Sequence, residues 1–327
     1  MSSETLKNRL TTEFLIQPQP IADINSRLFF VGSCFSENIC NYLQNSGFAC
    51  LKNPFGNLFN PHSIALCIEK IATEYRYSAQ DFTYHSGEFH SMHHHGTFKH
   101  TDAETLASRI NLQIETANDF LSIADIAIIT AGTAKVWQMR QPKMIVGNCH
   151  KIPGNEFTTR LLTETEIAKV YRDCIYYLRL INPGIKIMFT ISPVKHLRDG
   201  IQENIISKSR LISALAALRE KHTEILYFPS YEIQTEELRD HRFYSEDLAH
   251  PTAWATEYIF RRFCETCFTD VGRSYIEDAE NWLRMKKHRV MSENQAEIDT
   301  WKTKCDEAFE QFRSKYPSKT YWPSDWT

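Results

Sequence analysis

The sequence has no apolar stretch approaching the roughly 20 residues that a membrane-spanning helix needs. The first 20 residues, Met1 to Pro20, mix charges with Thr, Gln and Pro and contain no apolar run long enough for a signal peptide. Charge is nearly balanced as well, because the formal net charge of the 327 residues is -3, which gives no overall attraction to nucleic acid or anionic membranes. We therefore expect a cytoplasmic protein with neither nucleic acid nor a membrane as a partner.

Nine cysteines are present, but they lack the spacing of a disulfide scaffold. Their number is odd, and they are scattered from Cys34 to Cys305. Without a secretory signal, most should be reduced and buried as small apolar side chains. Cys264 and Cys267 form the only CxxC pair, and no second ligand pair completes a zinc site. We interpret this pair as helical core positions.

Internal repeats and low-complexity segments are absent too, and an alternating pattern fills the chain instead. Short runs rich in Ile, Phe and Val alternate with longer segments of helical periodicity. The predicted strands are residues 28–31, 126–130, 185–191 and 225–228, and the predicted helices are residues 37–45, 62–75, 103–122, 163–180 and 203–221. Such alternation predicts an α/β fold with helices on both faces of a parallel sheet. Ligands then bind at the carboxyl ends of the strands.

The C-terminal part differs from this pattern. From Ile276 to Tyr316 the sequence is charged, with apolar residues at approximate helix spacing. This predicts one or two amphipathic helices packed on the core, and a homo-oligomer contact through them is a second prediction. We divide the chain into an N-terminal segment (1–24), an α/β domain (25–268) and a C-terminal helical extension (269–327).

Two potential nucleophiles, Ser33 and Cys34, stand on the turn between the first predicted strand and the first predicted helix. Unpaired backbone N–H groups at a helix start favour negative charge and can lower the pKa of a thiol toward neutrality. Far downstream, Asp247 and His250 offer an acid and a base three residues apart, and Pro251 fits a helix that begins just after them. We interpret the two segments as one active site.

The motif Gly32-Ser33-Cys34-Phe35 resembles that of the GSCFA family, which is grouped with the SGNH or GDSL hydrolases. The resemblance extends over about residues 25–265, through the segments 53–56, 132–134, 192–196 and 247–251. It implies a three-layer flavodoxin-like fold and ester or acyl-group chemistry. In that superfamily a Gly-Asp-Ser motif supplies a nucleophilic serine, and a late Asp-x-x-His completes the triad. The matching positions here are Cys34 for the nucleophile, with Asp247 and His250 as its partners.

Acyl transfer also needs hydrogen-bond donors for the oxyanion. We expect the backbone N–H groups of Cys34 and Gly56 to be two of these oxyanion donors. The superfamily takes a further donor from the Asn of a Gly-x-Asn-Asp segment, but the matching residues here are Gly132-Thr133-Ala134-Lys135. Asn57 or Thr133 would replace that Asn. The alternative roles are a turn glycine for Gly56 and a helix N-cap for Thr133.

Histidines gather in one segment, which we expect to be an irregular loop over the pocket mouth. They are His85, His90, His93, His94, His95 and His100. Zinc would require convergent ligands, and we expect substrate contact, with His94 as the candidate, rather than a metal. His196 follows the strand predicted at 185–191, so it should line the pocket as a substrate contact or an alternative base.

The leading hypothesis is an acyl hydrolase or acyltransferase that needs no cofactor and forms a covalent intermediate on Cys34. Its substrate would be a small-molecule or carbohydrate acyl compound. A thioester passes readily to water, a hydroxyl or an amine, so hydrolysis and transfer both stay open. Three alternatives remain: Ser33 as the nucleophile, a non-catalytic binding module on a degenerate scaffold, and a metal-dependent hydrolase that uses the histidine-rich segment.

Overall fold

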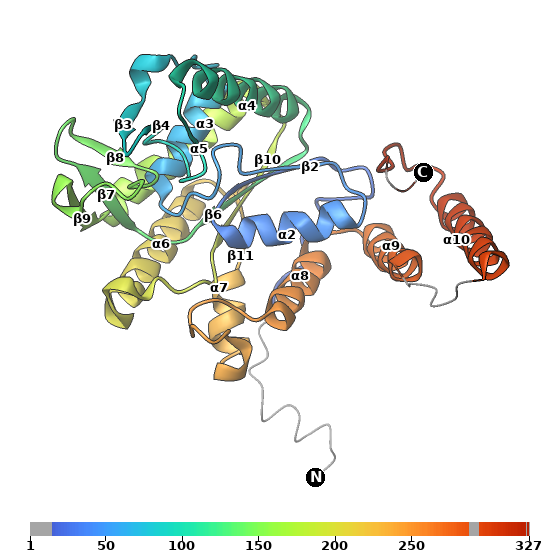
Figure 1. Cartoon of the computed structure of the whole chain (residues 1–327). Helices are drawn as coiled ribbons and strands as arrows, with labels where there is room; N and C mark the ends of the chain where they lie inside the picture. Colours follow the sequence, from blue (N-terminus) through green and yellow to red (C-terminus); the bar gives the residue numbers. More distant parts are fainter. Residues whose placement is uncertain (1–14, 288–293, 325, 327) are drawn as a thin grey trace, which may run out of the picture.

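The computed structural model describes residues 15–287, 294–324 and 326. At its centre is a parallel sheet in the order β11-β10-β6-β1-β2 (Figure 1). Its strands are β1 (Leu28–Gly32), β2 (Cys50–Lys52), β6 (Ile126–Ala131), β10 (Lys186–Ile191) and β11 (Leu226–Phe228). Counted along the chain, this is the 2-1-3-4-5 order of flavodoxin-like sheets, which confirms the predicted fold class. β2 escaped prediction because its three residues carry no recognisable periodicity.

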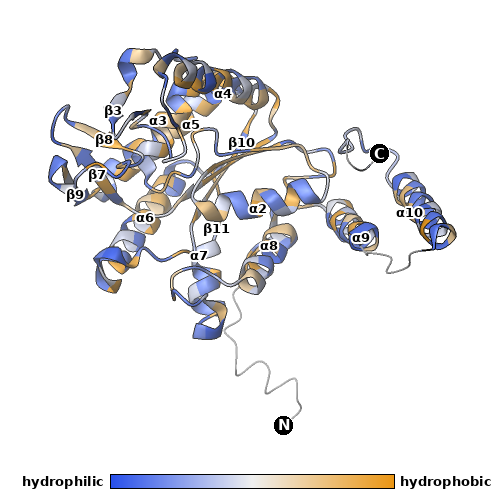
Figure 2. Cartoon of the chain, in the orientation of Figure 1, coloured by the Kyte–Doolittle hydropathy of each residue, from blue (hydrophilic) through white to orange (hydrophobic). Residues whose placement is uncertain are grey.

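Helices cover both faces of the sheet (Figure 1). On one face lie α3 (Pro61–Ala72), α4 (Ala103–Ile123), α5 (Glu164–Ile181) and α6 (Ile201–Lys221). On the other lie α2 (Cys34–Asn45), α8 (Ala253–Cys267), α9 (Asp270–Lys287) and α10 (Gln295–Lys315). The three-layer prediction is therefore confirmed. Figure 2 shows hydrophilic residues interspersed with hydrophobic ones along α2 and α8.

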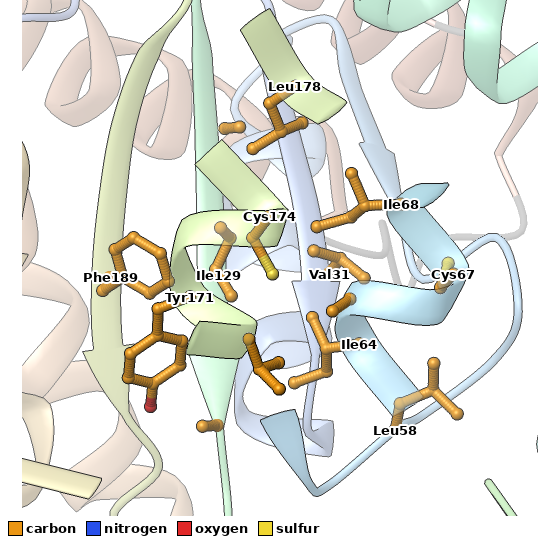
Figure 3. Close-up of a cluster of buried hydrophobic side chains, with 14 of the residues drawn as sticks. Val31, Leu58, Ile64, Cys67, Ile68, Ile129, Tyr171, Cys174, Leu178 and Phe189 are labelled. Carbon is orange, nitrogen blue, oxygen red and sulfur yellow. The ribbon is translucent and has the colours of Figure 1, made fainter. Parts of the chain in front are cut away.

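The two cores follow from the alternation of side chains along buried strands. In β1, Phe29 and Val31 face the α3 side, whereas Leu28 and Phe30 face the α2 side. Figure 3 shows Val31 with its sheet neighbours Ile129 and Phe189 against side chains from α3 and α5. Because both faces are covered, these strands are apolar at nearly every position, as the short apolar runs predict.

Two small antiparallel sheets lie outside the central one. The first contains β3 (Thr83–His85), β4 (Glu88–His90) and β5 (Lys99–His100), and the second contains β7 (Lys135–Met139), β8 (Met144–Val146) and β9 (Phe157–Leu161). The expectation of an irregular histidine-rich loop was therefore wrong in part. Ser86 and Gly87 both have positive φ, 51° and 86°, and such a pair closes a two-residue hairpin.

Short helical segments connect these elements. They are Ala79–Asp81, Gly154–Glu156, Leu197–Asp199, α7 (Ser230–Glu232), Ile233–Glu237 and His241–Phe243. Among the described residues, no helix is both long enough and apolar enough to cross a membrane. All nine cysteines are free thiols, and Cys264 and Cys267 are buried in α8 as predicted.

The C-terminal extension forms two helices that pack on the core, as predicted. Tyr275 and Trp282 of α9 and Phe309 and Phe312 of α10 join the same apolar cluster as Leu43 of α2. Residues 288–293, between the helices, and residues 1–14 of the predicted N-terminal segment lie outside the described residues. The predicted homo-oligomer contact through these helices stays a prediction.

Replacing Trp282 by alanine should lower the free energy of unfolding by about 3–5 kcal/mol. Its ring is 6% exposed and lies 4.8 Å from Phe309 and 4.9 Å from Trp326, centroid to centroid. Chemical denaturation measures the loss. Trp254→Ala is the control, because Trp254 is 56% exposed and should change the free energy far less. Equal losses in both variants would contradict this account of the extension.

Candidate active site

The turn that carries Cys34 is fixed by a close approach between two strands. Gly32 ends β1 with φ of 137°, and a Cβ atom there would lie 2.0 Å from the carbonyl oxygen of Thr130 in β6. Only glycine fits such a position. Ser33 follows, and Cys34 is the first residue of α2. The thiol therefore stands at a helix N-terminus, on the carboxyl edge of the sheet where the strand order reverses.

Partial burial decides the protonation of Cys34. Burial raises the pKa of its thiol above the ordinary value, although the backbone N–H groups of Phe35 and Cys34 act on the sulfur and lower it. Glu37 raises the pKa further, while Lys208 lowers it. The expectation that the helix start lowers the thiol pKa toward neutrality was therefore wrong, because desolvation raises the pKa by more than the backbone N–H groups lower it. At neutral pH the thiol keeps its proton, so a base must remove it.

Ser33 is placed poorly for nucleophilic attack. Its side chain is 1% exposed, and its hydroxyl has no hydrogen-bond partner in the described part of the chain. A nucleophilic serine needs a base within hydrogen-bond reach. The backbone of Ser33 instead joins the turn to β6, since its N–H donates to the carbonyl of Thr130 over 3.1 Å.

Asp247 and His250 form a bonded pair on the turn before α8. His250 Nδ1 lies 2.5 Å from Asp247 Oδ2, and the backbone N–H of His250 donates to Asp247 Oδ1 over 2.9 Å. The backbone N–H groups of His250 and Ala249, followed by the imidazole, lower the pKa of Asp247 to about 2. With Nδ1 donating to the carboxylate, Nε2 is left to accept a proton. Both side chains are about half exposed.

Several contacts bring this pair to the edge of the sheet that carries Cys34. The N–H of Lys195, in the loop after β10, donates to the carbonyl of Ala249 over 3.0 Å. Asn38, one helical turn after Cys34, lines the same groove as Pro251, the residue after His250. No hydrogen bond joins Cys34 to His250 within the residues that the structure describes. The structure thus places the two segments at one edge without a direct bond between thiol and imidazole.

His196 lies deeper in the same site. Its Nε2 atom is buried without a hydrogen-bond partner among the described residues. A Cβ atom on Gly132 would lie 2.8 Å from that Nε2. Burial, followed by the charges of Lys208 and His250, lowers the pKa of His196 to about 4, so its ring is neutral at pH 7. A neutral imidazole therefore lies beside the segment in which the superfamily pattern has its Asn donor.

Gly56 has an ordinary structural role. Its N–H donates to the carbonyl of Asn53 over 2.7 Å, so it has no free hydrogen for an oxyanion. Its φ is 74°, and a Cβ atom there would lie 2.4 Å from His95 Cβ. The turn-glycine alternative therefore describes Gly56, and the expected oxyanion donor has to come from elsewhere.

Asn57 and Thr133 are also engaged within the protein. Asn57 donates to Glu37 over 3.1 Å and accepts from Asn53 over 2.6 Å. The hydroxyl of Thr133 lies 3.0 Å from that of Ser207 and accepts from the N–H of Lys135. Strand β7 follows Thr133, so the helix N-cap alternative was wrong. Both predicted substrate contacts have internal partners for their polar side chains.

His94 belongs to the core rather than to the pocket. It is 0% exposed, its ring stacks on Phe55 at 3.8 Å, and its Nδ1 lies 2.6 Å from the hydroxyl of Ser91. Burial lowers its pKa well below the ordinary value. The His94 side chain is fully buried against Phe55 and bonded to Ser91, which corrects the expectation that it contacts the substrate. The described residues contain no group of three or more His, Cys, Asp or Glu side chains that could hold a metal.

Lys208 is the site residue that our sequence reasoning missed. It is 1% exposed on α6, and its Nζ donates to the carbonyl of Ser192 over 2.6 Å. Burial lowers its pKa to about 7, while the nearby Cys34 and Glu232 act in the opposite direction and raise it. A signal was present, because Lys208 and its neighbour Ser207 continue the buried stripe of Leu211 and Leu215. Polar residues on an apolar stripe indicate a buried polar site.

The GSCFA family model matches residues 27–263. No curated protein matches the chain. Among solved structures, the chain is similar to a putative acylhydrolase from Bacteroides fragilis (TM-score 0.40, 9% identity, covering 80% of this chain and 92% of that one). It is also similar to a carbohydrate esterase family 3 protein from Talaromyces cellulolyticus (TM-score 0.38, 8% identity, covering 78% of this chain and 99% of that one). A third similar structure is that of an acetyl xylan esterase from Butyrivibrio proteoclasticus (TM-score 0.37, 11% identity, covering 83% of this chain and 66% of that one).

Lys208→Met should remove a pH dependence of stability. The pKa of Lys208 is about 7 in the fold, against an ordinary 10.5, so the unfolded chain binds more protons between these values. The free energy of unfolding should then rise with pH from 7 to 10, by up to about 1.4 kcal/mol per pH unit. Denaturation of wild type and variant at each pH measures this contribution. Lys221→Met, on the exposed end of α6, is the control, and parallel pH profiles for wild type and Lys208→Met would contradict the assignment.

Proposed function

This chain belongs to the GSCFA family, and on that premise we propose that it is an acyl hydrolase or acyltransferase that acts through a thioester on Cys34. One arrangement carries the proposal. The Cys34 sulfur meets backbone N–H groups at the start of α2, on the sheet edge that also holds the bonded Asp247–His250 pair. The substrate class, a small-molecule or carbohydrate acyl compound, and the cytoplasmic location stay predictions.

In the proposed reaction, His250 acts as the base that a protonated thiol requires. Nε2 of His250 takes the thiol proton while the sulfur attacks the acyl carbon, and Asp247 stabilises the imidazolium. The same proton then passes to the leaving alcohol as its bond to the acyl carbon breaks. Water or a second nucleophile attacks the resulting thioester and regenerates the thiol. His196 is the alternative base, since it is neutral and lies at the same edge.

The oxyanion would be held by the backbone N–H of Cys34 and by Nε2–H of His196. A neutral imidazole donates one hydrogen bond without giving up a proton, as an oxyanion stabiliser must. The unpartnered Nε2 beside Gly132 supports this role. His196 thus replaces the missing Asn in the proposed mechanism.

Acetylation by p-nitrophenyl acetate, followed by intact-protein mass spectrometry, tests the nucleophile. Wild type and Ser33→Ala should gain one acetyl group, and Cys34→Ala should gain none at that site. The acetylation rate of His250→Ala should be lower by a factor of about 100 or more, because a general base contributes rate factors of that order. Peptide mapping separates Cys34 from the other thiols. An adduct that persists at the same rate in Cys34→Ala would defeat the thiol assignment, and a wild type that never reacts would favour the binding module.

His196→Ala and His196→Gln together test the oxyanion role. Loss of one donor should lower kcat by about 100-fold with little change in KM. The amide of glutamine keeps an N–H near the Nε2 position, so His196→Gln should recover much of that loss. Equal losses in both variants would point to a base or packing role instead.

A further inference from the structure

A groove of about 320 Å³ lies between α2 and the start of α8. One wall is a single face of α2, formed by Asn38, Asn41, Tyr42 and Asn45, because residues spaced by three, four and seven share a face. The other wall is formed by Pro251, Ala253 and Thr256. Cys34 precedes Asn38 by one turn, and His250 precedes Pro251. The groove therefore leads away from the proposed reaction centre.

The α2 wall is rich in free amide groups. Asn38 and Asn45 are exposed, and neither amide has a hydrogen-bond partner in the described part of the chain. The carbonyl of Asn41 accepts from Lys52 Nζ, which leaves its NH₂ group to donate. Each free amide offers donors and an acceptor together. Tyr42 is held by stacking on Phe260, with centroids 4.8 Å apart.

The charges that flank the groove are paired with one another. Lys52 lies 3.4 Å from Glu37. Arg261, near Tyr42, pairs with Glu257 at 3.1 Å and with Glu280 at 2.6 Å. An ionic ligand would find no uncompensated partner among these groups. The surface suits a neutral ligand with many hydroxyl groups, since a hydroxyl both donates and accepts.

We propose that this groove binds the non-acyl part of the substrate and that this part is a neutral oligosaccharide. The inference rests on the proposed function, because it places the ester at Cys34 and the sugar chain along α2. Asn45 follows Asn38 by seven positions along the helix, a span of about 10 Å. A single sugar ring is shorter than this, so the groove takes a chain of at least two rings.

Binding to Cys34→Ala protein tests the groove without turnover. The probes are cellotetraose, xylotetraose and maltotetraose, with glucose as the short control, and isothermal titration calorimetry measures the affinity. At least one tetrasaccharide should bind more tightly than glucose. Adding Asn38→Ala and Asn45→Ala should weaken it by about tenfold, because two hydrogen-bonding groups are lost. Asn155→Ala, an exposed amide on the Gly154–Glu156 segment, is the matched control and should change nothing.

Each outcome separates this inference from the proposed function. Binding that the groove variant loses and the Asn155 control keeps supports the inference. No binding of any tetrasaccharide, or equal binding in groove variant and control, overturns it even when wild-type protein is acetylated on Cys34. Tetrasaccharide binding in the groove without any acetylation of Cys34 overturns the proposed function and leaves the groove assignment standing.

Discussion

The close packing of β1 against β6 is the constraint on which the candidate site depends. Where the two strands end, the backbone of Gly32 lies so near the Thr130 carbonyl that any side chain would collide with it. This approach sets the direction in which the chain leaves the sheet and enters α2. It therefore places Cys34 in the first turn of a helix at the carboxyl edge, opposite the segments that arrive from β10 and from the turn before α8.

Burial then sets the protonation states around that thiol. The same desolvation raises the pKa of Cys34, lowers that of His196 to about 4 and lowers that of Lys208 to about 7. All three shifts favour neutral groups. These protonation states differ from those of a thiolate-imidazolium pair. In the proposed mechanism, a protonated cysteine therefore needs a base held by a carboxylate, as a serine does.

The two faces of α2 divide structure from the proposed binding role. Phe35, Ile39 and Leu43 pack into the core that α8, α9 and α10 share, so the aromatic C-terminal extension helps to hold the helix in place. The opposite face carries the amides of the groove. One amphipathic helix therefore carries the proposed nucleophile at its start, a core contact along one side and the proposed hydrogen-bonding surface along the other.

Local sequence pattern was enough to predict four features that the structure has: the apolar strands, the helices between them, the helical layers on both faces of the sheet, and the strand-to-helix turn at Ser33 and Cys34. Periodicity and turn chemistry act over a few residues, so they are readable from the chain. Only the tertiary structure decided which polar groups are free. In the fold, the N–H of Gly56 donates to the carbonyl of Asn53, and His94 is buried against Phe55. Lys208 comes close enough to act on the pKa of Cys34, which precedes it by more than 160 residues, and His196 Nε2 lies against Gly132. Desolvation and hydrogen-bond pairing depend on neighbours that are distant in sequence. For that reason the sequence could indicate a candidate site, but only the fold decided the burial, protonation and hydrogen-bond partners of its residues.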